Sequence, residues 1–441
     1  MQGMWSGYVE QHLIPRLHGF EILMASYAMA HLKLNLMLKE TGYEATQHDR
    51  LKVYLTNSLE EPHPDSGTLF ANWLSQEANE ANEVKREVPV MVVLGNPPYS
   101  VSSSNKGEWI TNLCEVYKKN LNERNIQPLS DDYIKFIRYG QYFIDKNNEG
   151  ILAYISNNSF IDGTIHRQMR RSLLETFDKI YIIDLHGNSR KNEVCPDGSK
   201  DENVFDIMQG VSINLFIKTN KKRKNQLAEV YHYDLYGKRE TKYEFLSEHS
   251  LDNIPFNSIK CEKDNYFFVS KNFANKDVYD EGIDIGKLFI LNKVGIATGK
   301  DSLYVNSSIN DLIKNIEAYF NTSADINLLK SYVYRPFDKQ YCYYDNNKLQ
   351  RARYDLMKHL LKNNTALCVS KVNRQLSLGY YWISNSIVDR HILDSSGDTT
   401  CCFPLYLYED LDNSKHPNFN NEIIQKFADG LKLKFTDEKT D

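Results

Sequence analysis

Residues 88–101, VPVMVVLGNPPYSV, join a continuous apolar run directly to two prolines. The run has no polar face, which is typical of a parallel strand that is buried on both faces of a sheet. Pro97 and Pro98 lack the N–H group that a sheet ladder needs, so they end the strand and fix the backbone of the turn. The stretch therefore predicts an α/β sheet with a rigid turn at the end of one strand.

The segments around this turn alternate between extended and helical patterns, with a polar loop expected at residues 60–86. The expected strands are residues 50–57, 88–99, 150–160, 179–187, 211–218 and 229–237. The expected helices are residues 23–42, closed by Gly42, residues 130–146, capped by Ser130, and residues 164–177. Such alternation indicates an α/β domain with a mostly parallel sheet.

The alternation ends near residue 255, where short aromatic strands and Asn-rich turns replace it. We therefore expect two domains, residues 1–255 and a mixed α+β domain of residues 256–441. Within the second domain, GIATGKDS at residues 295–302 differs from a phosphate-binding loop in the spacing of its glycines and in Asp301, and we interpret it as a turn.

The composition is that of a soluble globular protein, with 41% apolar and 25% charged residues. No membrane-spanning run or signal peptide is evident in the sequence, so we expect a cytoplasmic protein without a membrane partner. The seven cysteines form no CxxC pair, which disfavours a metal site or a disulfide framework. Because the net charge is −5, nucleic-acid binding would require locally concentrated basic residues.

The residue types of the turn suit an amino group as a substrate. The lone pair of a nucleobase amino group is delocalised into the ring, so methylation requires acceptors that draw its N–H bonds out of the base plane. The side-chain oxygen of Asn96 and the carbonyl of Pro97 are such acceptors, and Pro98 keeps them in position. Tyr99 offers a flat face for stacking against a base that has left its duplex.

The signature (Asn/Asp/Ser)-Pro-Pro-(Tyr/Phe) resembles that of amino-methyltransferases that use S-adenosylmethionine. More of the chain resembles the methyltransferase and target-recognition portions of Type ISP restriction-modification enzymes. The segments that carry this resemblance are, in order, HGFEILMASYAMAHLKL, VYLTNSLEEP, GNPPYS, NNSFIDG, DLHGNSRKN and YRPFD through FPLYLY. The resemblance implies a Rossmann-like S-adenosylmethionine-dependent methyltransferase sheet, followed by a target-recognition domain.

The resemblance also implies roles for three further residues. Glu21 would accept hydrogen bonds from the cofactor ribose, and Asn57 would contact the cofactor adenine, where the family often has an acid. Phe205 would face Tyr99 across the flipped base. The residues themselves leave alternatives open: a partner of the helix dipole for Glu21, an Asx turn for Asn57 and an ordinary core position for Phe205.

The family opens with a strand and a Gly-rich turn, of the form Asp-Pro-x-x-Gly-x-Gly, which approaches the methionine part of the cofactor. No such segment precedes Glu21 in this sequence. We therefore expect a sheet that lacks its first strand, from a truncated reading frame or a fragment. The missing N-terminal portion, and the nuclease and motor parts of a restriction-modification enzyme, are the expected protein partners.

A basic, tyrosine-rich stretch marks the second domain. Residues 331–375 hold nine Lys or Arg against three Asp, a net charge of +6, with six interleaved tyrosines. Such a stretch can neutralise phosphates and read base edges in double-stranded DNA, although a tyrosine-rich core with a basic rim fits it too. The residues expected to bind DNA are Arg335, Arg351, Arg353, Lys371 and Arg374.

The sequence thus predicts an adenine-specific DNA methyltransferase of a bacterial restriction-modification system. Its methyl donor would be S-adenosylmethionine, no metal would take part in the transfer, and the product would be N6-methyladenine. Two alternatives stay open: a catalytically inactive DNA-recognition module, and a methyltransferase of protein glutamine or RNA.

Overall fold

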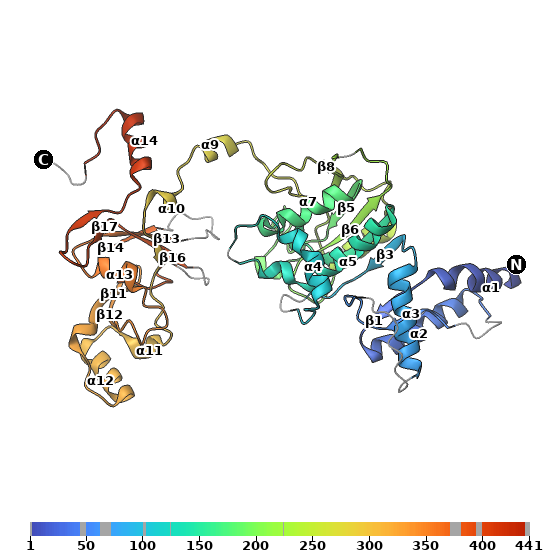
Figure 1. Ribbon diagram of the computed structural model, residues 1–441, viewed down its shortest axis with the longest axis horizontal. Helices are drawn as coiled ribbons and strands as arrows, with labels where there is room; N and C mark the ends of the chain where they lie inside the picture. Colours follow the sequence, from blue (N-terminus) through green and yellow to red (C-terminus); the bar gives the residue numbers. More distant parts are fainter. Residues whose placement is uncertain are drawn as a thin grey trace. The chain divides into compact units, whose positions relative to one another are not determined.

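The computed structural model describes residues 2–44, 50–61, 72–99, 103–123, 125–223, 225–370, 381–393 and 399–436 (Figure 1). The chain forms two compact units, Met1–Asn272 and Phe273–Asp441. The division expected at residue 255 falls inside the first unit, because strand β8 (Asn257–Ile259) pairs with the sheet of that unit. None of the described helices combines the length and apolar character that crossing a membrane requires.

A six-stranded sheet forms the centre of the first unit, in the order β3-β4-β6-β5-β7-β8. Its other strands are β3 (Val92–Gly95), β4 (Gly150–Asn157), β5 (Lys179–Asp184), β6 (Val211–Lys218) and β7 (Glu229–Asp234). Strands β3, β4, β5 and β7 run in one direction, whereas β6 lies antiparallel between β4 and β5. The prediction of a mostly parallel sheet therefore needs correction at its centre, where no crossover helix separates β5 from β6.

Apolar cores cover both faces of this sheet. The larger core joins Leu152 of β4 and Ile182 of β5 to the helices of one face, and the smaller core joins Ile183 to α8. The helices of this region are α4 (Glu108–Lys118), α5 (Asp132–Asn147), α6 (Ser159–Asp162), α7 (Arg167–Thr176) and α8 (Arg239–Glu248). The expected cap of α5, Ser130, was wrong by one residue, because the Asp131 side chain accepts the backbone N–H of Tyr133.

The N-terminal region adds a separate two-stranded parallel sheet of β1 (Gly19–Glu21) and β2 (Val53–Leu55). Its helices are α1 (Gln2–Tyr8), α2 (Met24–Glu40) and α3 (Asn72–Glu87). The polar loop expected at residues 60–86 was wrong in its second half, which forms α3. This helix buries Ala81 and Val84 together with the Glu77 carboxylate, which accepts the backbone N–H of Leu55 at 2.7 Å.

Strand β3 lies at the edge of its sheet, and one side of it has no neighbouring strand among the described residues. Two of its large apolar side chains are exposed, Val92 at 54% and Leu94 at 75%. Helix α2 likewise buries none of its residues, and it exposes Met24, Leu32 and Met37. An open strand edge with exposed apolar side chains is unusual in a soluble protein and marks a place where another segment can pair.

The buried Arg170 ties the C-terminal end of the first unit to α6 and α7 through hydrogen bonds. The Arg170 guanidinium donates to the carbonyl oxygens of Phe160, Gly163 and Asn265 at 2.6–2.7 Å, and its Nε lies 2.9 Å from the carbonyl oxygen of Tyr266. Burial lowers the pKa of Arg170 to about 10, so the side chain stays charged at neutral pH. Its bonds hold residues 265–266 against α6 and α7, which explains why the first unit extends beyond residue 255.

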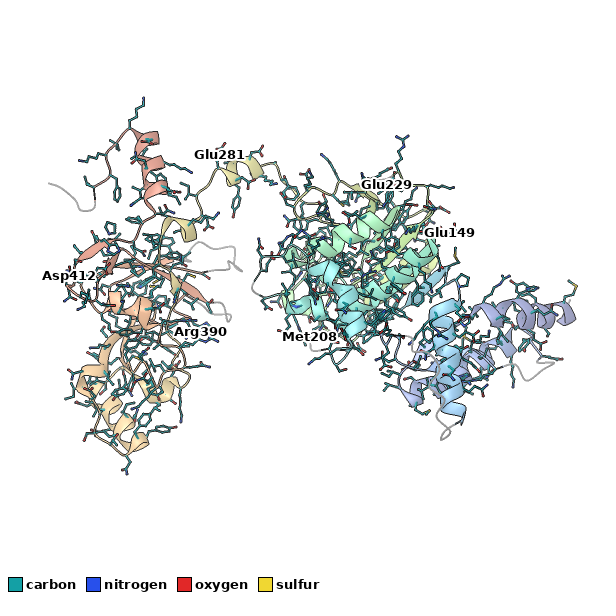
Figure 2. All side chains as sticks on the ribbon, in the orientation of Figure 1. Glu149, Met208, Glu229, Glu281, Arg390 and Asp412 are labelled. Atoms are coloured by element: carbon teal, nitrogen blue, oxygen red, sulfur yellow. The ribbon has the colours of Figure 1, made fainter. Side chains whose placement is uncertain are left out.

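The second unit contains two four-stranded sheets, β10-β12-β11-β15 and β14-β13-β16-β9, around one apolar core, and a two-stranded hairpin. Its strands are β9 (Lys293–Val294), β10 (Val305–Asn306), β11 (Leu329–Arg335), β12 (Asp338–Tyr343), β13 (Ala366–Ser370), β14 (Tyr381–Ser384), β15 (Ile387–Val388), β16 (Thr400–Pro404), β17 (Tyr406–Tyr408) and β18 (Lys415–Pro417). Its helices are α9 (Lys276–Asp280), α10 (Ile285–Leu288), α11 (Asp301–Tyr304), α12 (Ile309–Phe320), α13 (Tyr354–Leu360) and α14 (Asn421–Leu431). The unit is mixed α+β, and side chains fill both units densely (Figure 2).

We predict that Arg170→Leu lowers the free energy of unfolding of the first unit by about 3 kcal/mol or more, because several buried carbonyl groups lose their donor. The adjacent Arg171 makes an exposed ion pair with Glu175, so Arg171→Leu should cost less than about 1 kcal/mol. Urea unfolding of the two variants measures the difference. Equal losses would contradict the role assigned to Arg170.

Candidate functional site

Polar side chains gather where the codirectional strands of the first sheet end. Asn96 follows β3, Asn158 follows β4, and Asp184 and Asp234 are the last residues of β5 and β7. Asn158 donates to the Asp184 carboxylate at 2.9 Å. Ligands of open α/β sheets bind outside the carboxyl ends of the strands, so this edge is the candidate site.

The turn at the end of β3 is organised by a hydrogen bond between its own side chains. The Tyr99 hydroxyl donates to Asn96 Oδ1 at 2.9 Å and lies 3.4 Å from the carbonyl oxygen of Ile155 in β4. Burial raises the pKa of Tyr99 to about 12, so the hydroxyl keeps its proton at neutral pH. The Asn96 side chain is exposed, and its oxygen retains a second lone pair for another donor. Pro97 is buried beneath it.

Tyr99 and Phe205 are brought to the same part of the molecule. Both are partly buried and pack against the core cluster that includes Leu185 and Val211. Among the described ring contacts, however, Tyr99 meets Tyr133 edge-on, with centroids 6.5 Å apart, and no contact with Phe205 is present. Phe205 is therefore neither fully buried nor stacked on Tyr99.

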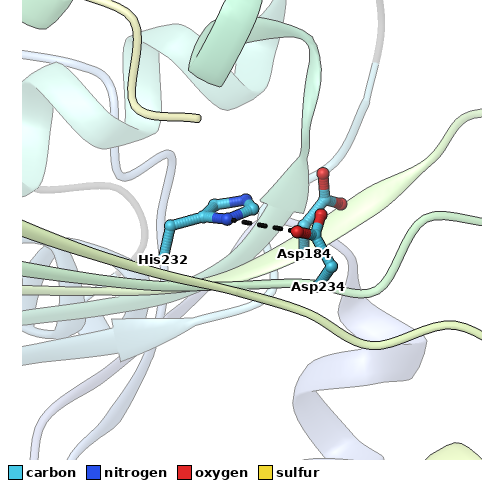
Figure 3. Close-up of side chains that lie close together, drawn as sticks. All are labelled: Asp184, His232 and Asp234. Atoms are coloured by element: carbon cyan, nitrogen blue, oxygen red, sulfur yellow. Dashed lines mark ion pairs between the residues drawn. The ribbon is translucent and has the colours of Figure 1, made fainter. Parts of the chain in front are cut away.

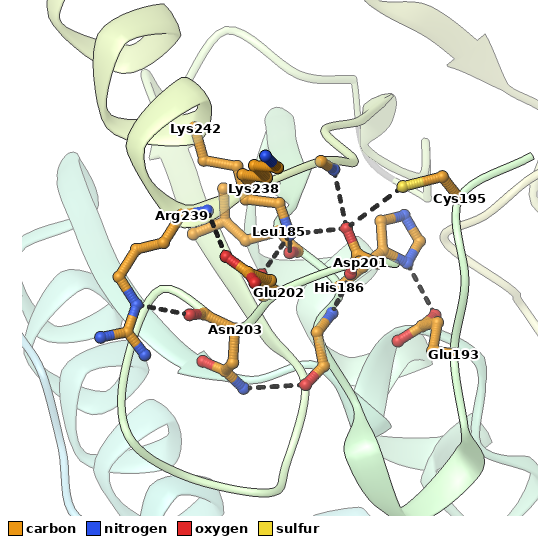
Figure 4. A network of polar contacts seen from close by, with 12 residues as sticks. Leu185, His186, Glu193, Cys195, Asp201, Glu202, Asn203, Lys238, Arg239 and Lys242 are labelled. Atoms are coloured by element: carbon orange, nitrogen blue, oxygen red, sulfur yellow. Dashed lines mark hydrogen bonds and ion pairs between the residues drawn. The ribbon is translucent and has the colours of Figure 1, made fainter. Parts of the chain in front are cut away.

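The loop that carries Phe205, residues 185–210, is braced by a buried ion pair (Figure 4). The Lys242 ammonium of α8 lies 2.8 Å from the Asp201 carboxylate, and both side chains are fully buried. Lys242 also donates to the carbonyl oxygen of Leu185 at 2.7 Å, and Asp201 accepts the backbone N–H groups of Gly187 and Gly237. The pair thus joins the end of β5, the loop and α8.

Asn203 transmits this bracing to Phe205. Its side-chain oxygen accepts the backbone N–H of Phe205 at 2.9 Å, and its amide donates to the carbonyl oxygens of Gly187 and Gln209. Arg239 adds a bond to the Asn203 carbonyl at 2.8 Å. The bonds from Asn203 to Gly187 and from Arg239 to Asn203 could not be predicted from the sequence, because these partners are 16 and 36 residues apart along the chain.

His186 links the loop to the ends of β5 and β7. Its ring nitrogens lie 2.8 Å from Glu193 and 2.9 Å from Asp234, and its ring stacks on Tyr236. Burial opposes the charge of the ring, but the hydrogen bonds to Asp234 and Glu193 outweigh it and raise the pKa of His186 to about 10. The residue is therefore an imidazolium at neutral pH.

Asp184, His232 and Asp234 form a group that could in principle hold a metal ion, since one ligand atom of each lies within 4.8 Å of the others (Figure 3). The two carboxylates already have partners, however. Asp184 accepts from Asn158 and from the His186 backbone, and Asp234 bonds to the His186 ring. We interpret Asp184 and Asp234 as the acidic partners of His186, and we assign no metal to the group.

Glu21 and Asn57 lie at the carboxyl ends of β1 and β2. Glu21 Oε1 accepts the backbone N–H groups of Ile22 and Leu23 at the start of α2. Asn57 Oδ1 accepts the backbone N–H of Leu59 at 3.0 Å, which is an Asx turn. The alternatives that the residues left open are thus both present, and a cofactor role would have to use the remaining polar atoms of these side chains.

A polar network ties Asn57 to the loop beyond the Asn96 turn. Asn57 donates to Asn105 Oδ1 at 3.1 Å, and Asn105 donates to the Asp132 carboxylate at 3.0 Å. Ser103 bonds to the same carboxylate and receives the Lys135 ammonium at 2.7 Å. These residues, which connect the end of β2 to the start of α5, were not predicted from the sequence.

In the second unit, Arg335 is partly committed to structure. It bonds to the buried Asp389 carboxylate at 2.8 Å, and its guanidinium lies over the Tyr334 ring at 4.1 Å. The other oxygen of Asp389 accepts the hydroxyl of the buried Tyr332 at 2.7 Å. The Arg335 side chain is still 36% exposed, so one of its faces remains open to a ligand.

Of the four other expected DNA-binding residues, the structure describes two, Arg351 and Arg353. Arg351 is exposed and forms an isolated backbone β-bridge with Ala297. The neighbouring Ile296 forms a bridge with Asp389. Arg351 and Arg390 therefore lie on either side of the segment that contains Ile296 and Ala297. Arg353 has a left-handed backbone and a buried Nε without a hydrogen-bond partner among the described residues. Lys371 and Arg374 lie outside the described residues. Arg390 is a basic residue that the sequence analysis did not single out.

The tyrosines of the basic stretch favour the alternative interpretation of that stretch. Tyr332, Tyr343 and Tyr344 are buried in the core of the second unit. They therefore support the fold, while the basic residues form its rim. Residues 295–302 likewise form a turn, with Gly299 at a φ of 77°.

Two family models match the chain. Residues 17–190 match the Eco57I restriction-modification methylase, and residues 321–440 match the Type ISP C-terminal specificity domain. No curated protein matches the chain. The two matches confirm the resemblance drawn from the sequence: one segment of this chain is similar to a restriction-modification methylase, and another is similar to a Type ISP specificity domain.

Three solved structures share the fold. The ATP-dependent Type ISP restriction-modification enzyme LlaBIII bound to DNA is 23% identical with a TM-score of 0.72, and the match covers 96% of this chain and 32% of that chain. The DrdV–DNA complex is 18% identical with a TM-score of 0.73, covering 98% and 47%. A nuclease-deletion mutant of the Type ISP enzyme LlaGI with a DNA substrate mimic is 19% identical with a TM-score of 0.68, covering 92% and 42%. The chain thus spans about a third to a half of the length of these proteins.

We predict that His186 makes stability fall with rising pH. Its folded pKa of about 10 exceeds the ordinary value of 6.5, so its contribution is complete below about pH 6.5, declines above it and is lost beyond about pH 10. His186→Gln should therefore flatten the melting temperature across this window. His249→Gln, which alters a ring bonded only to a backbone carbonyl, is the control and should keep the slope of the native protein. An unchanged slope in His186→Gln would refute the ion-pair assignment.

Proposed function

For a chain with one segment similar to a restriction-modification methylase and another similar to a Type ISP specificity domain, we propose an adenine-specific DNA methyltransferase. It transfers a methyl group from S-adenosylmethionine to the N6 amino group of a flipped adenine in double-stranded DNA. The observation that carries the proposal is the hydrogen bond from Tyr99 to Asn96 at the carboxyl end of β3, which aims an exposed acceptor.

The Asn96 turn offers the chemistry that an adenine amino group needs. The free lone pair of Asn96 Oδ1 accepts one N–H of the base, and the carbonyl of Pro97 accepts the other. These bonds would localise the nitrogen lone pair on the amino group. S-adenosylmethionine, when bound, would supply the methyl group, and cleavage of its bond from sulfur to methyl would release S-adenosylhomocysteine. The nitrogen becomes cationic and releases one proton to solvent, so Asn96 needs no change of charge.

The flipped adenine is held between aromatic side chains. Tyr99 supplies one face, and Phe205, on the loop that Asn203 and Arg239 brace, supplies the other. Both rings pack on one core cluster, and Tyr99 can keep its bond to Asn96 while one face of its ring meets the base. Stacking and phosphate contacts offset the few kcal/mol that flipping costs.

The residues that would hold the cofactor fit it only in part. Glu21 accepts the backbone N–H groups of Ile22 and Leu23 through one carboxylate oxygen, so its other oxygen can accept from ribose hydroxyls. Asn57 has its amide directed to Asn105 and Glu60, so contact with the cofactor adenine would require exchange of these bonds. We assign these two residues to the cofactor and the amino-group chemistry to Asn96.

We further propose that another polypeptide segment pairs with the free edge of β3. The exposed Val92 and Leu94 of that edge, and the uncovered apolar side chains of α2, are the surfaces it would cover. This segment would correspond to the strand and Gly-rich turn with which the resembling family opens. A second candidate function, a DNA-recognition module without catalysis, is favoured by the same open edge.

We predict that this chain alone shows no saturable binding of S-adenosylmethionine in the micromolar range, because none of the described strands pairs with the outer edge of β3. Isothermal titration calorimetry with the cofactor measures this directly. Micromolar binding by the chain alone would rule out the need for a covering segment.

In the assembly that does bind the cofactor, Asn96→Ala should slow methyl transfer to duplex DNA by about 100-fold or more, as expected for loss of an oriented polar partner. Asn96→Asp keeps an acceptor oxygen at this position, so it should recover most of the rate that Asn96→Ala loses. Single-turnover transfer from methyl-labelled S-adenosylmethionine provides the rates. A near-normal rate for Asn96→Ala would falsify the assignment, and DNA binding without any transfer by the native assembly would favour the recognition module.

A further inference from the structure

The turn between β11 and β12 presents one exposed aromatic ring. Arg335 pairs with Asp338, so Pro336 and Phe337 alone form the turn. Phe337 has a φ of 63°, and its side chain is 91% exposed. Proline followed by a residue of positive φ is the pattern of a type II turn, whose second central position ordinarily holds Gly or Asn.

Phenylalanine is an unfavourable choice at this position for folding. A bulky residue in the left-handed region is strained, and a ring that faces water gains little from burial. Glycine would satisfy the turn without either cost. Residues with such unfavourable backbone strain and exposure are found where a protein binds a ligand or catalyses a reaction. We therefore infer that the Phe337 ring contacts a ligand.

The turn between β11 and β12 is held in place by contacts at its base and beside the Phe337 ring. Arg335, at the base of the turn, bonds to the buried Asp389, which also accepts the hydroxyl of the buried Tyr332. The Phe337 ring meets Trp382 edge-on, with centroids 4.8 Å apart and planes at 84°, and Trp382 packs against the core. A ring supported in this way loses little conformational freedom when it binds.

The charge around the tip indicates what it binds. The surrounding stretch, residues 331–375, has a net charge of +6, and Arg335 and Lys339 flank the turn with partly or fully exposed side chains. The acid next to the ring, Asp338, is occupied by the Gln340 amide at 2.9 and 3.1 Å. A partner with both negative charge and flat apolar faces fits this surface, and a nucleic acid has both.

We propose that Phe337 stacks on a nucleobase of the DNA bound by the second unit, entering the duplex where a base pair is distorted. This inference rests on the proposed DNA function and adds a stacking contact to it. Apolar wedges of this kind insert between base steps in other DNA-binding proteins. The basic residues would hold the phosphates, and Phe337 would contribute affinity without charge.

The test compares the full chain with Phe337→Gly in binding to a fluorescein-labelled duplex of mixed sequence with one central mismatch, where unstacking costs least. A lost stacking contact of about 1 to 3 kcal/mol corresponds to about 5- to 150-fold weaker binding. The slope of log affinity against log salt should not change, because no phosphate contact is removed. The melting temperature should stay equal or rise, since glycine relieves the strain of the turn.

Two further variants make the test specific. Leu411→Gly removes another fully exposed apolar side chain from a turn of the same unit, and it should leave binding unchanged. Phe337→Trp keeps an aromatic face and should bind as the native chain does.

Native affinity in Phe337→Gly would overturn the stacking contact, and so would a loss accompanied by a lower melting temperature or a shallower salt slope. If the native chain binds no duplex at all, the proposed DNA function itself fails, which is a separate result.

Discussion

The parallel pairing of β3 with β4 decides where the chemistry of this chain can occur. It places Gly95 opposite Tyr154, so the turn that follows β3 lies beside Ile155, whose carbonyl receives the Tyr99 hydroxyl. That hydroxyl keeps its proton because burial raises the pKa of Tyr99, and it therefore fixes the Asn96 oxygen. The ion pair between Asp201 and Lys242 braces the neighbouring loop, and this loop places Phe205 against the same core cluster as Tyr99.

The same strand also explains what the chain leaves open. In a sheet of mostly codirectional strands, a strand that ends in the proposed site would normally lie inside the sheet, yet β3 has a neighbour on one side only among the described residues. Its exposed leucine and the uncovered face of α2 are costs that a paired strand would remove. The turn is complete by itself, whereas the cofactor region, with Glu21 and Asn57 already bonded within the chain, is not.

The sequence predicted those parts of the structure that depend on neighbours along the chain. The apolar runs of the six expected strands and the two prolines are local signals, and the strands are present. Helix α3 was missed because its polar surface conceals a narrow buried face at Ala81 and Val84. The Asp132 network, the His186 ion pairs and the left-handed Phe337 depend on contacts or strain that only the folded chain creates. The buried tyrosines of the second unit could not be told from base-stacking residues by spacing alone.

The central claim concerns the atom that is methylated. Duplex DNA treated with S-adenosylmethionine and the assembly that contains this chain can be digested to nucleosides and analysed by mass spectrometry. The Asn96 turn predicts N6-methyladenine, which should form far more slowly with Asn96→Ala than with the native chain. Methylation of cytosine, or of protein or RNA in place of DNA, would contradict the account.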